Sequence, residues 1–85
     1  MDQSTQREKS RETLIVDALS EVFALLAVTA ATPHVRELRT QARFYDRAIK
    51  NWTMVPPTFA RLDAMFVLVV ELYDKALAVK RSATT

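Results

Sequence analysis

The chain has 85 residues, of which 49% are hydrophobic and 26% charged; it has no cysteine and no glycine, and its net charge is +2. This length allows one small domain over residues 1–85, and the composition is that of a globular protein. Without cysteine there is no disulfide framework or thiolate site, and without glycine there is no phosphate-binding glycine loop. The composition therefore favours helices joined by short connections.

The first predicted helix spans residues 10–31, with Ser10 as its N-cap. Within it, the apolar run 22–31 also resembles the hydrophobic region of a secretion signal, because basic residues stand upstream of it. However, Asp17 and Glu21 lie just ahead of the run, and the run continues the helical pattern, so we expect a helix with no cleaved leader. Ten residues are also fewer than the ~20 that span a bilayer. We therefore expect a cytoplasmic protein that does not enter a membrane, consistent with its lack of cysteine.

The second predicted helix spans residues 33–51 and begins at the N-cap Thr32, followed by Pro33 at the first helical position. Two stripes run along it at helical spacing. The apolar stripe consists of Val35, Leu38, Ala42, Tyr45, Ile49 and Trp52. The second, which we call the basic stripe, consists of Arg36, Arg39, Arg43, Arg47 and Lys50. This helix is therefore expected to carry a core face and a cationic face.

The third predicted helix spans residues 57–80, after the pair Pro56 and Pro57. The β-branched residues in 67–70 would also suit a strand, but the sequence on both sides keeps the helical period. The polar ends, residues 1–7 and 82–85, are expected to be frayed. The fold class predicted is all-α, a bundle of three antiparallel helices. Its predicted core includes Leu19, Leu38, Ile49, Leu62, Phe66 and Val69.

The first and third helices are apolar on more sides than one three-helix core can bury. We therefore predict self-association, most simply as a two-fold homodimer. The predicted interface residues are those that project away from the core or lie in the second loop: Phe44, Trp52, Val67 and Leu68. An alternative for Trp52 is that it closes the end of the core, because it continues the apolar stripe.

Candidate catalytic and metal-binding residues are few. His34 and Glu37 share a helix face, but no second histidine and no cysteine is present to complete a metal site. The carboxylate pairs, Asp17 with Glu21 and Glu71 with Asp74, suit solvated faces better than acid–base catalysis. We predict no catalytic residue, no metal and no cofactor. A small helical enzyme with its site at a dimer interface is the least favoured alternative.

The basic stripe is the leading candidate for binding. Its five cations cover about 21 Å of one helix face, which could follow a phosphate backbone or an acidic protein surface. The simpler interpretation is a solvated charged face. The predicted function is a non-enzymatic interaction or regulatory module that acts through helix faces as a homodimer, with an acidic protein as a possible further partner. The alternative is a nucleic-acid-binding regulator that uses the basic stripe.

Overall fold

The computed structural model describes the backbone of residues 3–84 and the side chains of residues 11–82. Over this part of the chain it contains three α-helices, one short 3-10 turn and no strand. The elements in chain order are α1 (Gln3–Ala27), α2 (Pro33–Lys50), the turn η1 (Asn51–Thr53) and α3 (Phe59–Thr84). The prediction of an all-α protein with three helices is confirmed.

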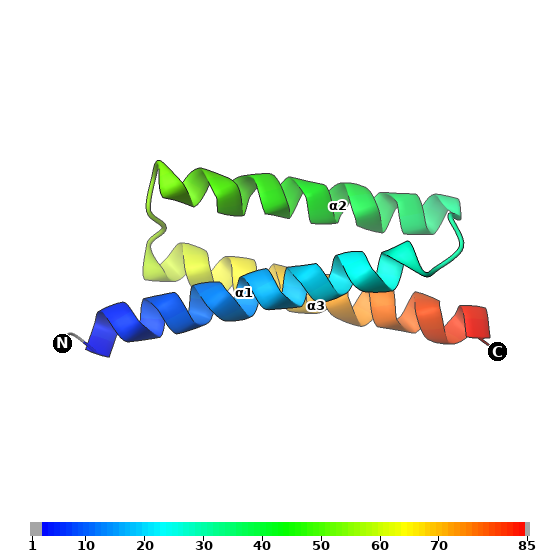
Figure 1. The fold of residues 1–85 in the computed structure, drawn as a ribbon, viewed down its shortest axis with the longest axis horizontal. Helices are drawn as coiled ribbons and strands as arrows, with labels where there is room; N and C mark the ends of the chain where they lie inside the picture. Colours follow the sequence, from blue (N-terminus) through cyan, green and yellow to red (C-terminus); the bar gives the residue numbers. More distant parts are fainter. Residues whose placement is uncertain (1–2, 85) are drawn as a thin grey trace.

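The three helices lie alongside one another in an elongated molecule of 49 × 22 × 17 Å. Figure 1 shows α1 and α3 running in the same direction, with α2 returning alongside them. The contacts between α1 and α3 are the most extensive, and α2 contacts each of them less extensively. A hollow remains between α2 and each of its two neighbours.

The core contains the apolar side chains that face inward from all three helices. Five of the residues predicted for it are buried: Leu19, Leu38, Ile49, Leu62 and Val69. The prediction for Phe66 is wrong, because that ring is only half-buried. Phe66 lies about 60° around α3 from Val69, towards the edge of the α1–α3 contact. There the guanidinium of Arg11 covers it, 5.9 Å from the ring centre.

Two helices extend beyond their predicted ends. α1 begins at Gln3, so residues 3–7 are helical where fraying was expected, while Met1 and Asp2 lie outside the described residues. Gln, Arg, Glu and Lys are good helix formers, and no proline or glycine interrupts them. α3 likewise continues through most of the predicted tail 82–85, of which only Thr85 is not described.

The C-terminus of α1 comes earlier than predicted, at Ala27. The Thr29 amide donates to the Leu26 carbonyl oxygen at 3.4 Å, three residues back, which tightens the last turn. The Thr29 hydroxyl donates to the Leu25 carbonyl oxygen at 2.7 Å. Threonine thus satisfies carbonyl groups that a helix end leaves without partners, and α1 ends without a glycine.

Threonine caps set where the other two helices begin. The Thr32 hydroxyl accepts the amide of Val35 at 3.2 Å, which places Pro33 at the first position of α2 as predicted. The Thr58 hydroxyl accepts the amide of Arg61 at 3.2 Å. α3 therefore begins at Phe59, after the cap, rather than at residue 57.

Candidate interaction surfaces

The structure divides the basic stripe into two groups. Arg36, Arg43 and Arg47 are exposed, and none of them forms an ion pair with any carboxylate among the side chains described. Arg39 and Lys50 both have partners within the chain. At most three cations of the basic stripe are therefore both exposed and available to bind a partner.

Arg39 connects α2 to the end of α1. Its Nη2 donates to the carbonyl oxygen of Leu26 at 2.9 Å, and the residue is half-buried. That carbonyl belongs to the last turn of α1, where backbone oxygens lack helical partners and the helix dipole is negative. Arg39 thus has a structural role, which its position in a cationic stripe did not reveal.

Lys50 pairs with Asp46 one turn earlier on the same helix. Its Nζ lies 2.9 Å from Asp46 Oδ2, and the two side chains are 76% and 36% exposed. Exposed pairs of this kind contribute only about 0–1 kcal/mol. The pair borders the hollow between α1 and α2, which has a volume of about 220 Å³ and apolar walls that include Val16 and Phe23.

The four predicted interface residues lie on different faces. Trp52 and Leu68 line the same hollow between α2 and α3. Phe44 is 69% exposed on α2, and its ring meets the ring of Tyr45 edge-on at 6.2 Å. Val67 is 53% exposed and projects about 100° away from Leu68 around α3. The sequence grouped these residues as one interface, whereas the structure separates Val67 from the others.

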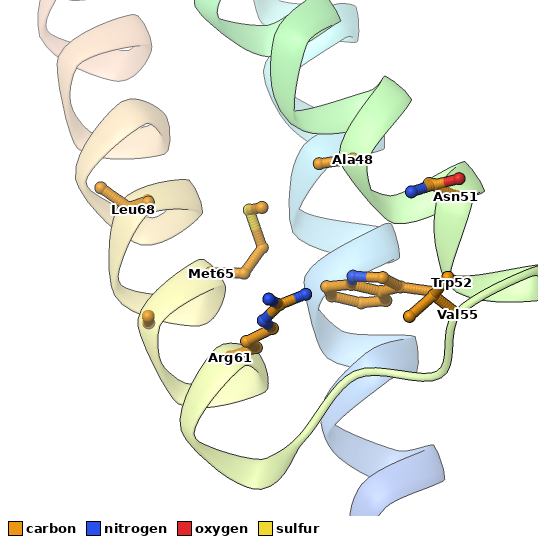
Figure 2. Close-up of a pocket in the computed structure, with 8 residues that line it drawn as sticks. Ala48, Asn51, Trp52, Val55, Arg61, Met65 and Leu68 are labelled. Atoms are coloured by element: carbon orange, nitrogen blue, oxygen red, sulfur yellow. The ribbon is translucent and has the colours of Figure 1, made fainter.

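The hollow between α2 and α3, called here the α2–α3 groove, has a volume of about 470 Å³. Its walls are formed by Ala48, Asn51, Trp52 and Val55 on one side and by Arg61, Ala64, Met65 and Leu68 on the other. Figure 2 shows the Trp52 indole and the Arg61 side chain extending towards each other across the gap, with Met65 pointing into it. Trp52 and Met65 are half-buried and also pack against the core. Trp52 therefore packs at the end of the core and also lines a surface groove.

A second apolar surface, the outer α1–α3 face, lies across α3 from the groove. Arg11 forms an ion pair with Asp63, which shows that these positions of α1 and α3 lie at the same level. Leu14 follows Arg11 by one turn, and Val67 follows Asp63 by one turn, so the two apolar side chains flank the same contact. Leu14, Val67 and Val70 are 55%, 53% and 36% exposed and define this face.

Both surfaces include residues that the sequence pattern did not indicate. Leu14 was not singled out, because it lies at the edge of the apolar residues of its helix, next to Ile15, which the structure buries. Arg61 drew no attention because it stands alone. Ala48 and Ala64 could have indicated the groove from the sequence, because small side chains on facing helices leave space between them.

His34 and Glu37, the residues considered for metal binding, lie on the surface. His34 Nδ1 lies 4.0 Å from Glu37 Oε2, with the two side chains 60% and 81% exposed, as expected for a solvated first turn. Among the residues described, no group of three or more histidine, cysteine, aspartate or glutamate side chains is placed to hold a metal ion. Within residues 3–84, none of the helices combines the length and the apolar character that crossing a bilayer requires.

Comparison with family models, with curated proteins and with solved structures finds no match to this chain.

Proposed function

We propose that the chain is a non-enzymatic interaction module that works as a homodimer of antiparallel three-helix bundles, joined through the outer α1–α3 face. The observation that supports this most directly is the exposure of Leu14, Val67 and Val70, at 55%, 53% and 36%, around one contact between two helices. Neighbouring exposed apolar side chains are typical of protein interfaces, whereas single ones need no explanation.

The charges on this face favour one arrangement of the two copies. Glu21 lies two turns after Leu14, and Asp74 lies two turns after Val67, so two carboxylates follow the apolar side chains on the same side. In a dimer with parallel α1–α3 faces, these carboxylates would meet their counterparts and repel them. A two-fold axis through the apolar side chains, with the faces antiparallel, keeps the carboxylates apart.

The size of a stable interface sets how far the contact extends. A standard interface buries about 800 Å² on each partner. The surface of this chain is 6116 Å², so the dimer must cover a substantial part of one side of the molecule. The contact therefore includes residues beyond Leu14, Val67 and Val70 along α1 and α3.

Sedimentation equilibrium at micromolar concentration tests the dimer, and we expect about twice the chain mass of 9.7 kDa. Val67→Glu should return the protein to a monomer without unfolding it, since a buried unpaired charge at the interface is costly and Val67 is exposed within one copy. Thr40→Glu, an equal change of charge on the exposed side of α2, is the matched control and should leave the dimer intact. A wild-type protein that stays monomeric over a wide concentration range would refute the proposal.

A second function is favoured by the exposure of Arg36, Arg43 and Arg47 on one side of α2. Arginine binds phosphate and carboxylate through two parallel hydrogen bonds, so this face could bind an acidic protein or a nucleic acid. With three phosphate contacts, the logarithm of the affinity for duplex DNA should fall with the logarithm of salt concentration with a slope of about −2.7. The double change Arg43→Glu with Arg47→Glu should abolish that binding. A nucleic-acid affinity unaffected by this double change would exclude the face.

A further inference from the structure

We propose that the α2–α3 groove binds one amphipathic helix of a partner protein, which presents apolar side chains to the groove and a carboxylate to Arg61. This site goes beyond the homodimer, because the groove wall formed by Leu68 lies about 100° around α3 from Val67. The two surfaces can be tested separately, and each proposal can fail without the other.

The shape of the groove suits a helix. On α3 its wall is formed by Arg61, Ala64, Met65 and Leu68, which follow one another at i, i+3, i+4 and i+7. Two helical turns of this kind are about 10.5 Å long. A helix that docks in a groove makes contact through apolar side chains at the same spacing, over the same length. The wall thus matches two turns of a partner helix laid along it.

The walls of the groove are largely apolar. Trp52, Met65 and Leu68 provide large apolar surfaces, and their side chains remain partly accessible. Ala48 and Ala64 stand on opposite walls and are too small to fill the space between them, so a partner side chain can enter. Exposed Phe44 lies one turn before Ala48 on α2 and extends the same apolar wall.

The charge of the groove favours an acidic partner. Among the described residues that line the groove, Arg61 is the only charged one, and none of them is a carboxylate. Among the side chains described, none forms an ion pair with Arg61. Its guanidinium can therefore accept a partner carboxylate through two hydrogen bonds. Because Arg61 stands in the first turn of α3, the partner helix places its acidic residue at that end of the groove.

The chain carries its own probe for this site, because Trp52 is its only tryptophan. A helical peptide with leucines at i, i+4 and i+7 and flanking glutamates is titrated against the protein while Trp52 fluorescence is recorded. We expect a saturable shift of the emission to shorter wavelength as the indole loses contact with water. A peptide with lysines in place of the glutamates should bind about tenfold more weakly, and Arg61→Glu should reverse that preference.

Two neighbouring substitutions provide the matched control. Leu68→Glu should abolish the Trp52 shift, whereas Val67→Glu, one residue earlier and about 100° around the helix, should leave the titration unchanged. Both side chains are exposed, at 40% and 53%, so neither change removes a core contact. Far-UV circular dichroism confirms that each variant is folded. Leu68→Glu should also leave the dimer intact, so that failure of the groove and failure of the dimer are distinguished.

The proposal is overturned if neither peptide shifts the Trp52 emission, or if Leu68→Glu and Val67→Glu weaken binding equally. It is also overturned if the emission shifts with protein concentration in the absence of peptide and Leu68→Glu prevents dimerisation. In that case a second copy of the chain occupies the groove.

Discussion

Replacing Arg39 by methionine is expected to destabilise the protein, whereas the same replacement at Arg43 is not. Arg39 donates to the Leu26 carbonyl oxygen at 2.9 Å and holds the end of α1 against α2. Arg43 is exposed and makes no ion pair with the carboxylates described. Methionine keeps much of the aliphatic part of the side chain and removes the guanidinium, so the comparison isolates the hydrogen bond.

The magnitude follows from the kind of bond and its burial. Hydrogen bonds to charged groups contribute about 1.5–3 kcal/mol to stability. Arg39 is only half-buried, so water can reach the carbonyl oxygen after the change, and the expected loss is about 1–2 kcal/mol. In a domain of this size, each kcal/mol lowers the melting temperature by about 4–8 °C. Arg43→Met should change the melting temperature by less than about 4 °C, since surface substitutions usually alter stability by no more than about 0.5 kcal/mol.

Thermal unfolding followed by circular dichroism at 222 nm measures both variants. Because a dimer is more stable at higher concentration, wild type and variants are compared at one protein concentration. If Arg39→Met and Arg43→Met unfold at the same temperature, the bond to Leu26 contributes nothing to stability. The whole basic stripe would then be a solvated or partner-binding face.

Three further predictions concern the core, the caps and the surface. Leu62→Ala should lower the free energy of unfolding, measured with urea, by about 2–5 kcal/mol. This loss should exceed that of Phe66→Ala, because Leu62 is 1% exposed and Phe66 is only half-buried. A larger loss for Phe66→Ala would place the core on another side of α3. Thr32→Ala should lower the free energy of unfolding by about 0.5–2 kcal/mol, because it removes the hydroxyl that accepts the amide of Val35. Thr32→Ser keeps a hydroxyl and should retain most of that stability. Arg11→Met should cost less than about 1 kcal/mol, since the Arg11 and Asp63 side chains are 44% and 55% exposed, and its effect should vanish at high salt.

The sequence predicted the helices and most of the core because both depend on local periodicity. Residues such as Leu38, Leu62 and Val69 lie at the centre of apolar stripes, and the structure buries all three. Residues at the edge of a stripe were harder to place. Phe66 and Leu14 have apolar neighbours at helical spacing, but their exposure depends on how far α1 and α3 approach each other. Periodicity along one helix contains no information about that approach.

The candidate surfaces were predictable to a smaller extent, for a similar reason. The basic stripe follows from positions in one helix, but the partner of Arg39 lies 13 residues earlier, on another helix. The groove joins residues 48–55 of one segment to residues 61–68 of another, so only the tertiary structure brings them together. A pattern along the chain can identify a face of a helix. It cannot identify what lies opposite that face.

The looser packing of α2 connects the groove to the stability of the fold. α2 contacts α1 and α3 less extensively than these two contact each other, and the groove lies between α2 and α3. A helix bound there would contact α2 and α3 at once, and it would bind only when the two are docked. Such a ligand stabilises the folded state by mass action, by about 2.7 kcal/mol at a hundredfold excess over its dissociation constant. A peptide that shifts Trp52 emission should therefore also raise the unfolding temperature of the wild type, and it should fail to do so for Leu68→Glu.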